Sequence, residues 1–321
     1  MRSPWIATFG RMLLCLLAMA RPGGGFADER IVHEQVRKLG GMLTADPKTQ
    51  KITRISLSSR PVRDGDLQML SSVTALQMLD VSRTNVTDKG LEHIAALPSL
   101  TALDLSHCLV TGTGLTALQK LKHLEILGLS GLQTTDRTLQ HAAQITSLKR
   151  LDLSRSRVTD AGLPALAGAV NLEQLVLLGT RVSDAGMESL AALPQLQSVN
   201  LSGTRISDAG IAALCRAGHL KSLYADNTRL SGQALQDIAA NDGLEVLCIA
   251  LANIDDSGMV HLSRLQNLRT LSVAGTPITD AGLGPLESLA SLEELMVSAT
   301  GVTEAGIQRL QQKLPRCVIH W

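Results

Sequence analysis

Three histidines, His93, His141 and His261, occupy the same place in a 24-residue repeat, and imidazole nitrogens are common metal ligands. If each repeat adds one parallel strand, His93 and His141, two repeats apart, lie roughly 10 Å from one another. Zinc binds its nitrogen ligands at about 2 Å, so the two rings are too distant to share an ion. We therefore expect solvated surface histidines and no metal site.

Acids and thiols are spread along the chain in a similar periodic way. Asp80, Asp104 and Asp152 recur at one repeat position without a nucleophile and base beside them. The chain contains no phosphate-binding glycine loop, no G-x-S-x-G and no H-E-x-x-H. Cys108, Cys215, Cys248 and Cys317 lack the paired spacing of a disulfide framework or a C-x-x-C metal site. The sequence predicts a protein that is not an enzyme and has no cofactor; a hydrolase using Asp104 or Asp152 is the enzymatic alternative.

A repeat of 24 residues, free of insertions and deletions, positions all these side chains. Its clearest copy is LEQLVLLGTRVSDAGMESLAALPQ, residues 172–195. The copies open at Ile52, Leu76, Leu100, Leu124, Leu148, Leu172, Leu196, Leu220, Leu244, Leu268 and Leu292. A fixed period of this length predicts a solenoid in which each copy buries its apolar side against its neighbours.

The consensus L-x-x-L-x-L-x-x-T-x-V-[TS]-D-A-G-L-x-x-L-x-x-L-P-x resembles the leucine-rich repeat over its first eleven positions. Its second half resembles the cysteine-containing subclass found in F-box and ribonuclease-inhibitor-like proteins and in many bacterial exported proteins. The resemblance covers roughly residues 52–321. It implies an α/β fold: a curved right-handed solenoid with a parallel β-sheet on the concave side and α-helices on the convex side. It also implies a binding surface rather than one defined activity.

Most repeat positions have a structural explanation. Leu151 and Leu153 alternate as in a strand with one buried face, and Thr159 with Asp160 resembles a helix N-cap followed by an acid in the first turn. Loss of such a cap is expected to lower stability by about 1 kcal/mol. Gly162 is expected where the helix passes too close to a neighbour for a side chain. The same glycine recurs as Gly90, Gly114, Gly186, Gly210, Gly258, Gly282 and Gly306.

The chain divides into four parts. Residues 1–27 have a basic start and the apolar run MLLCLLAMA, which predicts a cleaved signal peptide and export to the periplasm or outside the cell; an uncleaved anchor is the alternative. Residues 28–51 form an N-terminal cap, with a helix from Asp28 to Leu39 and a strand at 42–45. Residues 52–315 hold eleven repeats. Residues 316–321 form a capping strand, with Trp321 expected to cover the exposed end of the core.

Side chains that the repeat does not fix point from the strands into the concavity. They are charged in the N-terminal copies and small or apolar in the C-terminal ones. Tyrosine and arginine are favoured interface anchors, so Arg83, Arg155 and Tyr224 are the strongest candidates. The full predicted partner-binding set is Asp80, Arg83, Asp104, His107, Asp152, Arg155, Asn200, Tyr224 and Asp226.

A second ladder consists of Arg157, Arg181, Arg205 and Arg229, one repeat apart on the turn after the strand. It could bind a polyanion such as a phosphate chain, a sulfated glycan or a nucleic acid. However, Asp160, Asp184 and Asp208 follow three residues later and are expected to neutralise it in part.

The leading hypothesis is a monomeric, non-catalytic module that binds another protein through its concave face. The net charge of +1 gives no overall attraction to nucleic acid or membrane, and neither is an expected partner. One alternative is an F-box-like substrate-recognition adaptor of a ubiquitin ligase, although residues 1–51 leave little room for an F-box. Polyanion or glycan binding through the arginine ladder is the other alternative.

Overall fold

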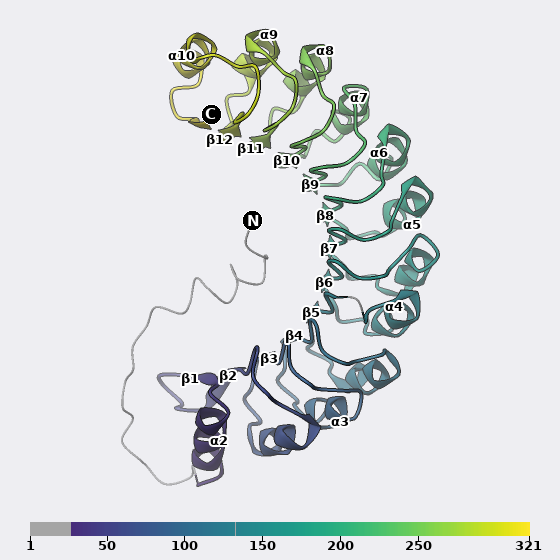
Figure 1. The fold of residues 1–321 in the computed structure, drawn as a ribbon, viewed down its shortest axis with the longest axis vertical. Coiled ribbons are helices and arrows are strands. Elements are labelled where there is room, and N and C mark those ends of the chain that lie inside the picture. Colours follow the sequence, from purple (N-terminus) through teal and green to yellow (C-terminus); the bar gives the residue numbers. More distant parts are fainter. Residues whose placement is uncertain (1–26, 132) are drawn as a thin grey trace.

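The computed structural model describes residues 27–131 and 133–321, so the predicted signal peptide lies outside the described residues except for Ala27. The described chain forms a single sheet of thirteen strands in sequence order. The sheet bends into an arc, with the strands on the inner side and the helices on the outer side (Figure 1). This confirms the predicted leucine-rich-repeat architecture.

The strands of the sheet are three residues long, apart from the first two. They are β1 (Met42–Ala45), β2 (Ile52–Ser56), β3 (Met78–Asp80), β4 (Ala102–Asp104), β5 (Ile126–Gly128), β6 (Arg150–Asp152), β7 (Gln174–Val176), β8 (Ser198–Asn200), β9 (Ser222–Tyr224), β10 (Val246–Cys248), β11 (Thr270–Ser272), β12 (Glu294–Met296) and β13 (Val318–His320). β1 is antiparallel to β2, and all later neighbours are parallel and in register at a spacing of one repeat.

The outer side is formed by short helices. The α-helices are α2 (Ala27–Lys38), α3 (Gly90–Ile94), α4 (Asp136–Ala142), α5 (Met187–Ala191), α6 (Asp208–Cys215), α7 (Ala234–Ile238), α8 (Asp256–Met259), α9 (Asp280–Leu283) and α10 (Glu304–Lys313). The 3₁₀ helices are η1 (Asp64–Ser72), η2 (Thr113–Lys120), η3 (Leu163–Gly168), η4 (Asp184–Gly186), η5 (Val260–Arg264) and η6 (Gly284–Ser288). Within the described residues, no helix combines the length and apolarity needed to cross a membrane.

The resemblance implied α-helices throughout, and the structure differs in using 3₁₀ helices for several repeats. A repeat of 24 residues leaves only one or two helical turns after the strand and its loop. The tighter 3₁₀ helix, which is favoured in short pieces, fits this space.

One aliphatic core runs the length of the array between the sheet and the helices. Leu79, Leu103, Leu127 and Leu151 occupy matching positions of adjacent strands and are fully buried. Because each leucine packs against the copies before and after it, the core has no natural break within the repeats.

The two ends of the array are closed in different ways. At the N-terminal end, α2 and the β1–β2 hairpin form the predicted cap, and Val32 and Val36 of α2 are buried. At the C-terminal end β13 pairs with β12 in the predicted register. The prediction for Trp321 was wrong, because this residue follows the end of β13 and is 62% exposed. Buried residues of α10 and its following loop close the core instead, among them Leu310, Leu314 and Cys317.

In most repeats an aspartate at the helix start, or two to three residues before it, joins one repeat to the next. In a typical case, Asp160 Oδ1 accepts from Ser183 N at 2.8 Å and Asp160 Oδ2 accepts from Ser183 Oγ at 2.6 Å. We call such a contact a rung. Within the described residues, rungs join Asp64 to Thr87, Asp88 to Thr111, Asp136 to Thr159, Asp160 to Ser183, Asp184 to Ser207, Asp208 to Ser231, Asp256 to Thr279 and Asp280 to Thr303.

The rungs change the predicted role of the hydroxyl residues. Ser183 and Ser207 occupy the N-cap position but make no side-chain cap hydrogen bond, and their hydroxyls donate to the preceding repeat. Thr279 and Thr303 do both, since each also accepts from a backbone N–H of its own helix. The simple N-cap prediction was therefore incomplete, and the larger role is between repeats.

The rungs also explain the recurring glycine. A Cβ built on Gly162 would collide with the Asp136 carboxylate, and one on Gly114 would lie 2.7 Å from Asp88 Cβ. This confirms the predicted close approach and identifies the neighbour as the rung aspartate of the preceding repeat.

Two repeats replace the rung aspartate by glycine, and each has a local substitute. After Gly112, Thr138 takes the place of the recurring glycine and its hydroxyl donates to Thr111 O at 3.2 Å. After Gly232, the expected hydroxyl residue is Asp255, which accepts from Ser257 N and Gly258 N and so caps its own helix. Because Gly232 has no carboxylate, Asp255 meets no negative charge at the place where the rung aspartate normally lies.

Candidate functional site

The eighth position of each repeat forms a row along the concave face, just after the strands, and we call it the inner edge. It consists of Ser59, Arg83, His107, Gly131, Arg155, Gly179, Gly203, Asn227, Leu251, Gly275 and Ala299. Every one of these residues has a positive φ, between 52° and 117°. Glycine adopts this conformation freely, whereas other L-residues do so at a cost of about 1 kcal/mol.

Large side chains on the inner edge lie over glycines of the next repeat. A Cβ on Gly131 would be 2.8 Å from His107 Nδ1, and one on Gly179 would be 3.6 Å from Arg155 Cγ. Leu251 covers Gly275 in the same way. The glycines thus provide space in which the preceding side chain can lie along the edge.

The predicted cations of the N-terminal half are accessible. Arg83, His107 and Arg155 are all exposed. Partial covering of the ring, and then the positive charges of Arg83 and Arg155, lower the pKa of His107. The imidazole is therefore kept neutral at neutral pH, with its edge available to donate or accept a hydrogen bond.

The predicted aspartates of the same half form the floor beneath these side chains. Asp104 and Asp152 are buried, and Asp80 is half-buried. Asp104 Oδ1 accepts from Ser106 N at 2.9 Å, and Asp152 Oδ1 accepts from Ser154 N at 2.8 Å. The sequence prediction that these carboxylates reach a partner directly is not supported, because they are turned onto the backbone.

Burial raises the pKa of Asp104 to about 6, and the negative charges of Asp80 and Asp152 act in the same direction. Hydrogen bonds from Ser106 oppose the shift. At the same position of its own repeat, Asn200 accepts from Ser202 N at 2.9 Å. An amide oxygen can therefore accept this hydrogen bond in place of a carboxylate, without a negative charge.

Tyr224 and Asp226 mark the middle of the face. Tyr224 is half-buried, and burial raises the pKa of its hydroxyl. Asp226 is buried, and its Oδ1 accepts from Ala250 N at 2.8 Å. Of this pair, only Tyr224 can contribute to an interface surface.

Sequence reasoning missed two residues of this face. Leu251 is 63% exposed although it is apolar and has a φ of 58°. Its signal was the presence of leucine at a position where the other repeats place glycine, alanine or polar residues. Arg150 of β6 is half-buried, and its Nε finds no hydrogen-bond partner among the described residues. Burial lowers its pKa, and Tyr224 lies near enough for the two side chains to influence each other.

Within residues 27–131 and 133–321, potential metal ligands are dispersed, and burial suppresses the ionisation of two thiols. No group of three or more histidine, cysteine or acidic side chains in these ranges could hold a metal ion. Burial raises the pKa of the Cys215 and Cys248 thiols to about 12, which makes them poor nucleophiles. His93, His141 and His261 lie on α3, α4 and η5 and are partly exposed.

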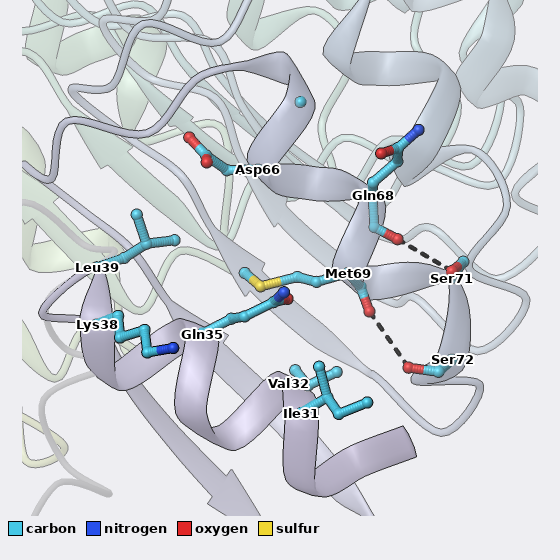
Figure 2. Close-up of a pocket in the computed structure, with 11 residues that line it drawn as sticks. Ile31, Val32, Gln35, Lys38, Leu39, Asp66, Gln68, Met69, Ser71 and Ser72 are labelled. Carbon is cyan, nitrogen blue, oxygen red and sulfur yellow. Dashed lines mark hydrogen bonds between the residues drawn. The ribbon is translucent and has the colours of Figure 1, made fainter. Parts of the chain in front are cut away.

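A separate groove lies between α2 and η1 at the N-terminal cap. Figure 2 shows Ile31, Gln35 and Lys38 of α2 facing Asp66 and Met69 of η1 across a volume of about 820 Å³. Its walls mix apolar and polar side chains. They hold no pair of acid and base within hydrogen-bonding distance, so the groove adds no catalytic candidate.

Comparison with known proteins agrees with the architecture. A family model described as "Leucine Rich repeat" matches residues 74–95, 96–118, 144–167, 193–215 and 264–286. No curated protein sequence matches the chain. The fold is similar to that of an internalin from Listeria monocytogenes, with a TM-score of 0.57 and 16% identity over 92% of this chain and 94% of the internalin chain. It is also similar to a TDR receptor, with a TM-score of 0.54 and 19% identity over 83% of this chain and 46% of the receptor chain.

Proposed function

We propose that this leucine-rich-repeat protein is a non-catalytic module that binds another protein through the inner edge and the adjoining concave face. The fold is typically a binding scaffold, and stacked repeats provide extended concave surfaces. The proposed contact residues are Arg83, His107 and Arg155 in the N-terminal half, with Tyr224 and Leu251 further along.

The observation that carries this proposal is the left-handed conformation of exposed, bulky residues. Gly131, Gly179, Gly203 and Gly275 occupy the same position without strain. Arginine, histidine and leucine there are strained by the positive φ, and their side chains remain exposed. Residues held in strained conformations cluster at sites of function, where the strain is maintained for another purpose.

The polar floor supports this arrangement. Asp104 and Asp152 bind backbone N–H groups beneath the exposed cations and keep the strand ends in place. The cations are thus fixed at their backbone while their side chains remain free to contact a partner. An acidic partner surface complements them.

The test replaces Arg83, His107 and Arg155 by glycine in one variant. We expect its free energy of unfolding to stay unchanged or rise by up to about 1 kcal/mol, because glycine relieves the positive φ. We expect partner capture to fall, because the contact side chains are gone. The measurements are chemical unfolding and quantitative affinity capture from native extract on immobilised protein.

The matched control replaces Ser59 and Ala299 by glycine, since both are exposed and have positive φ but small side chains. This control should retain the partners of the unaltered protein. If the triple variant captures the same proteins in the same amounts, the inner edge is not the binding site.

The proposal also covers where the protein is located and to which subclass of leucine-rich repeats it belongs. We propose export, supported by the basic start and apolar run of residues 1–27, and N-terminal sequencing of the mature protein tests it. We also propose kinship with the cysteine-containing repeat subclass. Cys108 supports it by occupying the Asn/Cys position, buried, with its thiol donating to Val81 O at 3.0 Å.

A further inference from the structure

Four arginines follow the inner edge at the tenth position of consecutive repeats, and we call Arg157, Arg181, Arg205 and Arg229 the arginine band. Each backbone N–H donates to a carbonyl of the preceding repeat. The distances are 2.8 Å to Thr134 O, 3.2 Å to Val158 O, 3.0 Å to Val182 O and 3.0 Å to Ile206 O. The four backbones are therefore fixed in a ladder with a spacing of about 5 Å.

The guanidinium groups of the band are exposed and unpaired. Asp160, Asp184 and Asp208 were expected to neutralise them, but both oxygens of each carboxylate accept from the next repeat in a rung. Within 27–131 and 133–321, none of the four arginine side chains forms an ion pair or hydrogen bond. The carboxylates therefore lie near the band without pairing with its guanidinium groups.

Small residues flank the two central arginines of the band on both sides, whereas Arg155 and Asn227 flank the two outer ones on the inner-edge side. Gly179 and Gly203 lie on the inner-edge side, and the exposed Ala185 and Ala209 lie at the fourteenth position on the other side. No bulky side chain from these positions rises beside the guanidinium groups. A polymer backbone can therefore approach Arg181 and Arg205 closely, and the exposed Arg157 and Arg229 continue the row on either side.

We propose that the arginine band binds a linear, base-free polymer carrying sulfate or phosphate groups. Guanidinium groups bind tetrahedral oxyanions through paired N–H donors, and four of them in a line suit a repeating anion. Single-stranded nucleic acid is disfavoured because its binding sites stack bases on aromatic rings. In the described residues the aromatic side chains are Tyr224 and Trp321, which lie on the sheet floor and at the chain end, not on the band.

The class of polymer also follows from what the band lacks. A peptide is usually recognised by pockets for alternate side chains or by addition of a strand to a sheet edge. The band offers neither, since glycine and alanine flank its two central arginines and its backbone N–H groups already donate within the solenoid. This inference is independent of the proposed protein-binding function, which uses other residues.

The test measures binding of the full mature protein to heparin oligosaccharide and to inorganic polyphosphate of similar charge. One variant carries Arg157→Gln, Arg181→Gln, Arg205→Gln and Arg229→Gln. The control carries Lys120→Gln, Lys122→Gln, Arg137→Gln and Arg264→Gln, which removes the same charge from exposed positions elsewhere. Thermal unfolding of both variants confirms that they remain folded.

We expect the band variant to bind at least tenfold more weakly and the control to bind within twofold of the unaltered protein. The slope of log affinity against log salt should become shallower by about 3 in the band variant, as expected for the loss of four anion contacts. Binding of heparin alone assigns the site to sulfated polysaccharide, and binding of polyphosphate alone assigns it to phosphate polymers.

Three outcomes overturn the proposal. The first is no measurable binding of either polymer at low salt. The second is an equal loss in the band variant and the control, which would indicate a general charge effect. The third is equally tight binding of oligo-dT or poly-glutamate, which would assign the band to nucleic acid or acidic protein.

Discussion

The rungs and the inner edge both repeat every 24 residues, but the residues of the rungs suit their positions and several residues of the inner edge do not. Along the rungs, aspartate, hydroxyl residue and glycine fit one another, and each contact satisfies donors of the next repeat. Along the inner edge, arginine, histidine and leucine occupy a conformation that suits glycine. The difference separates residues that hold the solenoid together from residues kept at the expense of stability.

The largest effect is expected from a substitution that breaks a rung. Asp184→Ala removes the acceptor of Ser207 N and Oγ, which lie 2.7 and 2.6 Å from the carboxylate. Loss of two hydrogen bonds to a charged group should lower the free energy of unfolding by about 3 kcal/mol. Denaturant unfolding measures it, with partner capture by the folded protein unchanged.

The control is Asp242→Ala, an exposed aspartate outside the rungs, which should stay within about 0.5 kcal/mol. If the two variants lose similar stability, the rungs are not what joins the repeats.

The second effect concerns the floor under the inner edge. Because the pKa of Asp104 rises to about 6, the folded state prefers its protonated form. Its stabilising contribution is complete below pH 3.8 and is lost as pH increases through 6. Asp104→Asn should therefore raise the free energy of unfolding by about 2 kcal/mol at pH 7.5 and have little effect near pH 4.

Asn200 shows that an amide oxygen can replace this carboxylate at the matching position. Denaturant unfolding at several pH values provides the comparison. A stability difference between the two proteins that does not change from pH 4 to 7.5 would contradict the burial argument.

The smallest effect is expected from a substitution that tests only the backbone conformation of the inner edge. Gly203→Ala places a Cβ no closer than 3.7 Å to another heavy atom, so only its φ of 67° opposes the substitution. We expect the free energy of unfolding to fall by about 1 kcal/mol. Gly243→Ala is the matched control, since it has open space and no positive φ. Thermal unfolding distinguishes them, and equal midpoints would remove the strain argument for Arg83 and Arg155.

The fold was predictable because leucine periodicity alone sets the register, and Leu79 pairs with Leu103 as counted from the sequence. The rungs could not be predicted in this way. The partner of Asp160 lies 23 residues away, and from the sequence alone an aspartate at this place is explained more simply as part of a helix N-cap. The N-cap pattern and the rung pattern contain the same residue types. Only the structure shows to which repeat the hydroxyl donates.

The candidate site was predictable in position but not in detail. Arg83, His107 and Arg155 are exposed as expected, whereas Asp104 and Asp152 turn inward. Sequence cannot separate these cases, since an aspartate at a strand end can face solvent or accept from the backbone two residues on. The positive φ was visible only indirectly, as glycine mixed with large residues at one position.

Gly232 and Asp255 show that the repeats are not interchangeable units. A tandem duplication of residues 172–195 would place Asp184 beside a second Ser183 and create a further rung of the normal type. Duplication of residues 244–267 would instead place Asp256 against a second Asp255, carboxylate against carboxylate. Lengthening this array is therefore tolerated at some junctions and opposed at others, and its order of repeats carries information that its period does not.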